Sequence, residues 1–235
     1  MNNQDLNYQH PDVVAFATSE QKAAFYKHTY GHVAGGVLVF ILLEALFLQS
    51  EFLVNTLLSF TQGYLWLVLI GGFMGFSWLA QKMVADGTSK PKQYLGYFIY
   101  IVGQALLFVP MLYIVMSYTG TIVLKQAVAV TAALFIALTV VAFMSKVNFS
   151  FLRSIIAIGF LLAMGAIVAG MIFGFSLGLW FSVAMCALAA GSILYETQQL
   201  QYQYATNQYV AAALGLFSSL MLLFWYVLRI FMSRD

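Results

Sequence analysis

The amino-acid sequence predicts an all-α integral membrane protein with seven transmembrane helices. The first observation is composition, since 63% of the residues are hydrophobic and 8% are charged, whereas soluble domains average about 25% charged residues. Ten basic and eight acidic side chains are too few to cover a soluble domain of this size, so most of the surface is expected to face lipid. The second observation is that seven stretches reach the roughly 20 apolar residues that a spanning helix needs.

The predicted spans follow one another along the whole chain. In order, they cover about residues 31–50, 64–84, 94–117, 121–144, 152–173, 176–197 and 209–232. Short connectors at 118–121 and 174–178 predict tight antiparallel hairpins. Pro110 is expected to kink the third span, because proline removes a backbone donor and clashes with the preceding turn. We expect a polar N-terminal segment at residues 1–25 and one seven-helix domain at residues 26–235.

The distribution of basic residues predicts the orientation. Seven of them lie on the N-terminal side of the predicted spans: Lys22, Lys27, Lys82, Lys90, Lys92, Lys146 and Arg153. The opposite side has Lys125, Arg229 and Arg234. Because Lys and Arg favour cytoplasmic loops, the N-terminus is expected in the cytoplasm and the C-terminus outside it. The first thirty residues lack the pattern of a secretory signal, so no cleavage is expected.

Glycines spaced four residues apart predict close helix packing. Such spacing occurs at Gly31/Gly35, at Gly71/Gly75 and in the series Gly170/Gly174/Gly178. Small residues let two backbones approach closely in lipid, where no hydrophobic force drives helices together. We expect these glycines to serve contacts within one chain rather than dimerisation.

Two acidic residues fall inside predicted spans, whereas the other six lie in loops or tails. They are Glu44, in the first span, and Glu196, in the sixth. A mid-membrane acid costs roughly 2.5–3.5 kcal/mol to insert, so such residues usually face the bundle interior or a water-filled cavity. Glu44 is close to the end of its span and is expected to reach the headgroups, which makes it a secondary candidate.

Glu196 is the main candidate for a proton- or ion-sensing residue. At helical spacing its own face carries Ser192, Ala189 and Met185, and the next span carries a stripe of small residues formed by Ala211, Ala212, Gly215, Ser218 and Ser219. Two small-faced helices joined by a short loop would enclose the carboxylate. Enclosure disfavours the charged form of a carboxyl group, so protonation becomes a possible switch. The alternative is an interfacial acid without a function.

The sequence gives little support for an enzyme, a metal site or a nucleic-acid partner. GFSLG at 174–178 fits the Gly-x-Ser-x-Gly pattern, but that motif needs a strand–turn–helix and a histidine within reach. His10, His28 and His32 all lie at the opposite side of the predicted membrane. Neither these histidines nor the lone Cys186 predicts a zinc site. The formal net charge of +2 does not favour nucleic acid, and we expect no cofactor.

Four passages are similar to passages of a known family, namely YKHTYGHVAGGVL at 26–38, ILYETQQL at 193–200, NQYVAAALGLFSSLMLLF at 207–224 and MSRD at 232–235. They resemble the Bax inhibitor-1 family, also called the transmembrane Bax inhibitor motif family, and most closely its bacterial YccA branch. The resemblance implies a seven-span bundle in the bacterial inner membrane, with the last helix at the centre. It also implies a non-enzymatic protein.

The resemblance implies two alternative functions. Relatives are described as pH-sensitive calcium leaks that use one aspartate in the sixth span and one in the seventh. Glu196 matches the first position and Ser219 the second, so the acid pair is lost and calcium, which prefers several oxygen ligands, is poorly served. Relatives of the YccA branch bind and restrain the membrane protease FtsH. Modulation of FtsH, with the N-terminal segment as suspected contact, is therefore favoured over a calcium or proton leak gated by Glu196.

Overall fold

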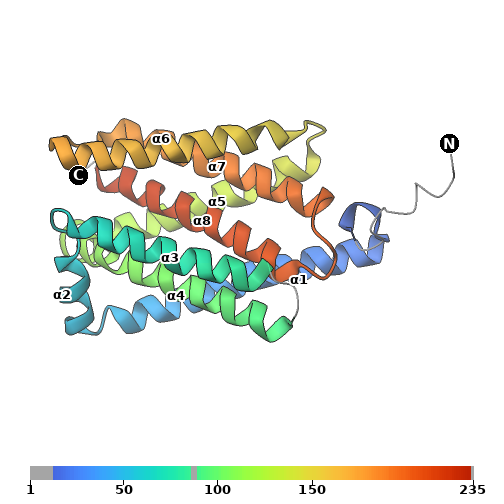
Figure 1. Cartoon of the computed structure of the whole chain (residues 1–235), viewed down its shortest axis with the longest axis horizontal. Coiled ribbons are helices and arrows are strands. Elements are labelled where there is room, and N and C mark those ends of the chain that lie inside the picture. Colours follow the sequence, from blue (N-terminus) through green and yellow to red (C-terminus); the bar gives the residue numbers. More distant parts are fainter. Residues whose placement is uncertain (1–12, 86–88, 234–235) are drawn as a thin grey trace.

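A computed structural model describes residues 13–85 and 89–233 as a bundle of helices (Figure 1). The α-helices are α1 (Ser19–Phe47), α2 (Glu51–Ser59), α3 (Leu65–Ala85), α4 (Lys90–Ile114), α5 (Thr121–Met144), α6 (Leu152–Phe173), α7 (Gly178–Tyr202) and α8 (Tyr209–Met232). Short 3₁₀ turns lie at η1 (Val14–Phe16) and η3 (Phe149–Phe151), and a π-turn, η2 (Val115–Thr119), extends α4. The described ranges contain no strand, only an isolated antiparallel bridge between Val13 and Ala205.

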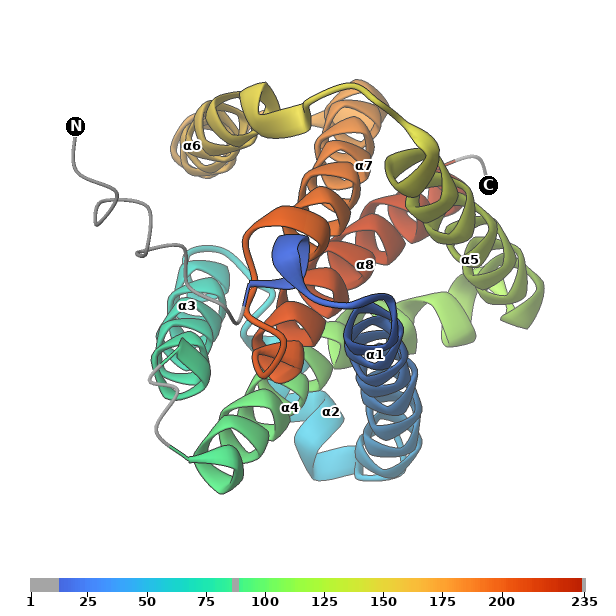
Figure 2. The ribbon, with the colours of Figure 1, turned by 90° about the vertical axis from the view of Figure 1, so that its right-hand side faces the viewer.

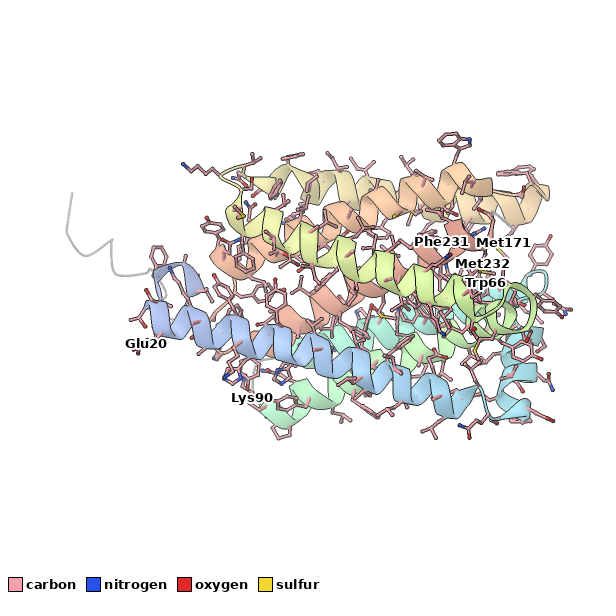
Figure 3. The ribbon with its side chains drawn as sticks, turned by 180° about the vertical axis from the view of Figure 1, so that it is seen from behind. Glu20, Trp66, Lys90, Met171, Phe231 and Met232 are labelled. Atoms are coloured by element: carbon pink, nitrogen blue, oxygen red, sulfur yellow. The ribbon has the colours of Figure 1, made fainter. Side chains whose placement is uncertain are left out.

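The seven long helices confirm the predicted spans. Each is long and apolar enough to cross a membrane, and successive helices run antiparallel along the bundle (Figure 1). The protein is therefore a multi-pass membrane protein. We call the end where α1, α4, α6 and α8 begin the N-terminal end, and the opposite end, where α2 lies, the C-terminal end. Figure 3 labels Glu20 and Lys90 at the N-terminal end.

The last helix lies at the centre of the bundle, as the resemblance implied. Figure 2 shows α8 with the other six long helices around it. It packs against α1, α3, α4, α5 and α7, and its residues are buried on several faces, including Leu216, Phe217 and Leu223. α6 is the one long helix that does not pack extensively against α8, since it packs mainly against α7. One side of α8 is therefore not covered by a closely packed neighbour.

Two contacts fix α6 on α7. A Cβ atom added to Gly159 of α6 would lie 2.6 Å from a methyl carbon of Leu188 on α7, so the helices touch where glycine leaves room. The side chain of Gln198 on α7 binds the connector that leads into α6. It accepts from the backbone N–H of Phe149 at 2.6 Å and donates to the carbonyl of Val147 at 2.8 Å. The start of α6 is therefore attached to α7.

Most of the glycines that mediate close packing are not those that the spacing predicted. In the series Gly170/Gly174/Gly178, a Cβ added to Gly170 would lie 3.1 Å from the carbonyl oxygen of Phe175 in the following hairpin, whereas Gly174 and Gly178 face open space. Gly31, Gly35, Gly71 and Gly75 face open space, with no atom within 4 Å of an added Cβ, so the prediction of packing contacts there is wrong. Close approach occurs instead at Gly36, Gly96, Gly103, Gly159 and Gly215. The four-residue spacing identifies a face of a helix, but it does not say whether that face meets another helix or lipid.

The described part of the N-terminal segment is folded onto the bundle. The backbone N–H of Val14 donates to the carbonyl of Tyr204 at 2.9 Å, and the Val14 side chain is fully buried. Thr18 then caps α1 in a reciprocal pair with Gln21, in which each side chain accepts from the other residue's backbone N–H. Residues 13–18 therefore hold the start of α1 against the loop between α7 and α8.

Replacing Gly96 by alanine should destabilise the protein. The added Cβ would lie 2.8 Å from the Cβ of Met83 and 2.9 Å from the backbone oxygen of Ala80, so α3 and α4 must move apart. Overpacking of this kind typically costs 1–3 kcal/mol, so we expect the Gly96→Ala free energy of unfolding to fall by about that amount. Thermal unfolding in detergent measures it.

The matched control is Gly75→Ala on α3, whose added Cβ meets nothing within 4 Å. Alanine is a better helix former than glycine by about 1 kcal/mol, so this variant should be as stable as the wild type or more so. A Gly96→Ala protein that unfolds at the wild-type temperature would contradict the close α3–α4 contact.

Candidate functional site

A cavity of about 1050 Å³ lies against the side of α8 that α6 does not cover. Its walls come from α3, α4, α6, α7 and α8, and we call it the lateral cavity. The lining runs from Arg153 and Tyr204 at the N-terminal end to Trp66 and Arg229 at the C-terminal end. Figure 3 shows Trp66 and Met171, which line it from α3 and α6, near the same end of the bundle. The cavity therefore extends along most of the membrane-spanning length.

Glu196 lines this cavity from α7, and its carboxyl group lies against the bare backbone of Gly215 on α8. A Cβ added to Gly215 would be 2.7 Å from Oε2 and 3.1 Å from Cδ of Glu196. The glycine therefore leaves the space that the carboxyl group occupies. Ser192 and Ala189, one and two turns before Glu196, are buried on the same face. Glu196 thus lies between two small-faced helices, as the residue pattern predicted, but its side chain is only partly buried because it also faces the cavity.

Glu196 is not at the end of its helix. The predicted span stopped at residue 197, but α7 continues to Tyr202 and the loop follows at 203–208. Tyr204 of this loop also lines the cavity. Burial, and to a smaller extent the nearby Glu196 carboxylate, raises the pKa of the Tyr204 phenol above its usual value, so this phenol keeps its proton at neutral pH. Glu196 therefore lies six residues before the end of α7, on a cavity that it shares with Tyr204 of the loop.

Ser219, the second predicted site residue, lines the same cavity. It lies one turn after Gly215, about 6 Å further along α8, and is buried. The neighbouring Ser218 accepts a hydrogen bond from the phenol of Tyr100 on α4 at 2.6 Å. The site thus combines one carboxyl group with several hydroxyl groups.

The described residues offer no second acid for a metal. Glu196 is the only carboxylate among the residues that line the cavity, and no group of three His, Cys, Asp or Glu side chains is found in the described part of the chain. One carboxylate with hydroxyls can bind and release a proton. It cannot supply the several hard oxygen ligands that calcium prefers.

Glu44, the secondary candidate, occupies a different environment. Its side chain is only 4% exposed, and neither carboxyl oxygen has a hydrogen-bond partner in the described structure. It follows Phe40 by one turn on the α1 face where Phe40 packs against Phe108 of α4. The expectation that Glu44 reaches the headgroups is therefore wrong, because α1 turns this position toward the bundle. Glu44 does not line the lateral cavity.

Three features of the site were not predicted. Arg153 lines the cavity from the first turn of α6, and Gln104 lines it from α4, where its side chain is buried. Tyr204 is the third. Its position in a connector that is otherwise rich in Gln, Asn and Thr is a signal that could have been recognised, because an aromatic residue in a polar loop can fold the loop onto the core. For Gln104 a polar side chain inside an apolar span gave a comparable signal.

Other candidate residues lie away from Glu196. The suspected partner-binding segment is described from residue 13 onward, and residues 1–12 lie outside the described structure. Ser176 of the GFSLG pattern lies in the hairpin between α6 and α7 at the C-terminal end. His28 and His32 are at the N-terminal end, where they pack against the ring of Tyr209. The structure therefore places Ser176 at the opposite end of the bundle from His28 and His32, the two histidines among the described residues.

Comparisons with known proteins concern almost the whole chain. Residues 22–235 match the family model described as Inhibitor of apoptosis-promoting Bax1. The chain is also similar to the uncharacterized protein PA2604 of Pseudomonas aeruginosa, with 28% identity over 167 residues that cover 70% of this chain and 72% of the relative. The family match includes both Glu196 and Ser219.

A hydrophobic carbodiimide should modify Glu196 and spare Glu44. Glu196 lines a cavity large enough for such a reagent, whereas Glu44 is closed off by packing. We expect dicyclohexylcarbodiimide to label the intact protein mainly at Glu196, with mass spectrometry of peptides as the measurement. Unfolded protein, in which both residues react, is the control. Equal labelling of the two residues in the folded protein would show that the cavity does not distinguish them.

Proposed function

The chain belongs to the Bax inhibitor-1 family, and from its site we propose that it is a pH-sensitive leak for protons or small monovalent cations, gated by Glu196. The observation that carries this proposal is the position of the Glu196 carboxyl group, which lines a cavity along α8 and lies against Gly215. An acid in this position is costly to bury. A role in a pathway accounts for it.

The lining of the cavity supports a path for water and ions. Hydroxyl and amide groups face it at several levels, namely Ser77, Gln81, Tyr100, Gln104, Ser192 and Ser219. These groups can hydrogen-bond to water that enters. Glu196 is the only acid among the described lining residues, so its protonation state sets the negative charge of the path.

The gating step follows from the chemistry of a carboxyl group. When Glu196 is neutral, it can stay against Gly215 without attracting water or a cation. When it loses its proton, the enclosed negative charge draws water and a cation toward it. Cation conduction is therefore expected to increase as the pH rises. A proton or a monovalent cation suits one carboxylate with hydroxyl neighbours better than calcium does.

Replacing Glu196 by glutamine should abolish the pH dependence of cation flux. Glutamine has a similar shape but no titratable group. In liposomes that contain the full chain, we expect wild-type potassium flux to be greater at pH 8 than at pH 6, and Glu196→Gln flux to be low at both. Glu44→Gln serves as the matched control, because Glu44 does not line the cavity, and it should retain the wild-type pH response. Identical flux for the wild type and Glu196→Gln at both pH 6 and pH 8 would exclude the leak.

A second proposal concerns the N-terminal segment. We propose that a membrane protease of the FtsH type engages this segment, in a bacterial inner membrane with the N-terminus in the cytoplasm. The supporting observation is that residues 13–16 are anchored on Tyr204 and Ala205, in the loop whose Tyr204 lines the same cavity as Glu196. Lys22 strengthens the anchor by donating to the carbonyl of Ala15 at 3.0 Å. The chain that precedes Val13 therefore starts from a fixed point at the N-terminal end.

Deleting residues 1–12 should slow degradation by FtsH and leave the fold unchanged. The deletion stops before Val14, whose buried side chain and backbone hydrogen bond belong to the bundle. Degradation by purified FtsH in proteoliposomes measures the effect. We expect at least a several-fold slower turnover, with the wild-type melting temperature retained. A twelve-residue replacement of scrambled order distinguishes sequence recognition from a need for length, and unaltered turnover of the deletion would contradict the proposal.

A further inference from the structure

The lateral cavity lies between two helices that face lipid. α3 and α6 both line it, yet they are not among the helix pairs that pack extensively on each other. Figure 2 shows them on adjacent sides of α8, with α4 next to α3 and α7 next to α6. Only 11% of the apolar window of each of these spans is buried inside the bundle. The cavity therefore borders the hydrocarbon region of the bilayer.

The two halves of the cavity differ in chemistry. Near the N-terminal end it is lined by Glu196, Arg153, Gln81, Tyr204 and Gln208. Toward the C-terminal end the lining becomes apolar and aromatic, with Ile70, Ile167, Met171, Leu222, Trp66 and Trp225. The rings of Trp66 and Trp225 stack with their centroids 6.4 Å apart. The C-terminal half therefore offers a surface suited to an acyl chain.

Arg229 lines the C-terminal end of this apolar half. It is exposed and lies one turn before the end of α8 at Met232, which is the depth where a spanning helix meets the headgroups. The only described carboxylate on the cavity, Glu196, lies against Gly215, fourteen residues earlier in α8 and thus about 21 Å away along the helix axis. The positive charge of Arg229 is therefore not offset within the cavity.

We propose that the C-terminal half of the lateral cavity binds one anionic phospholipid. Its phosphate lies on the Arg229 guanidinium, whose planar donors match phosphate oxygens, and one acyl chain lies between α3 and α6 against Trp66, Ile167 and Leu222. A lipid is the source of this phosphate because the site joins a cation at headgroup depth to an apolar groove that faces the bilayer. The other end of the cavity does not suit it, since the Glu196 carboxylate shares that end with Arg153.

The lipid proposal rests on other residues of the cavity than the proposed leak does, so the two proposals can fail separately. The experiment uses the full chain, purified in detergent and stripped of lipid, with native mass spectrometry as the readout. We expect dioleoyl-phosphatidylglycerol to occupy one site more tightly than dioleoyl-phosphatidylcholine. Arg229→Gln should weaken phosphatidylglycerol binding by roughly tenfold, while Arg153→Gln, the arginine at the opposite end, should leave it unchanged. Equal binding of the two lipids, or equal loss in the two arginine variants, would overturn the proposal.

A second pair of variants tests the groove itself. Ile167→Trp places a larger side chain on the lining and should reduce lipid binding, whereas Ile172→Trp changes a residue of α6 that is 60% exposed and is not part of the lining, so binding should persist. Displacement of the bound lipid by millimolar glycerol phosphate would show a phosphate site without a chain requirement and would overturn the assignment to a lipid. Unchanged binding in Ile167→Trp would also overturn it. Helical content and elution volume confirm that each variant is folded.

Discussion

The attachment of α6 to α7 is the constraint on which the candidate site depends. Gly159 lets α6 approach Leu188 of α7, and Gln198 of α7 holds both ends of a short connector segment, at Val147 and Phe149, just before α6 begins. α3, in contrast, packs against α4 and α8. The two helices are thus tied to different partners, and α8 keeps one side that neither covers closely. A bundle in which α6 packed directly on α8 would have no cavity at Glu196.

The two acids within the spans differ in their surroundings, and this difference makes Glu196 rather than Glu44 the candidate site. Glu196 is placed against a glycine, with a cavity beside it that polar side chains line. Glu44 is buried with both carboxyl oxygens unpartnered among the described residues and with no access to that cavity. Burying a carboxyl group without a partner costs free energy, and at Glu44 no neighbour in the described structure offsets that cost. Only at Glu196 does the surrounding space let water or an ion offset that cost, and this difference is why the pathway is assigned there.

The sequence was sufficient for the spans and for the pairing of Glu196 with the small residues of α8, because both depend on local composition and helical periodicity. The sequence was not sufficient to predict which glycine-bearing helix faces meet another helix. Gly71 and Gly75 repeat the spacing of a packing motif but face open space, whereas Gly96 meets Ala80 and Met83. Periodicity defines a stripe on one helix, and the partner is set by the arrangement of all seven. The cavity could not be predicted for the same reason. It exists because α3 and α6 do not pack closely on each other. The helix α2 was missed because nine residues are too few to register as a span.

The two halves of the lateral cavity make opposite demands on the space that they share. A path for water or cations past Glu196 needs the cavity to be hydrated along α8, because an ion cannot cross an apolar segment without partners for its charge. An acyl chain held between Trp66, Ile167 and Leu222 fills the C-terminal half and excludes that water. The same volume cannot hold both at once. A lipid whose phosphate lies on Arg229 would therefore keep the path closed at the end opposite to Glu196, and conduction would require both an ionised Glu196 and a groove from which the chain has withdrawn. Control of the leak would then be divided between the proton on α7 and the bilayer beside α3 and α6, with α8 as the element that both contact.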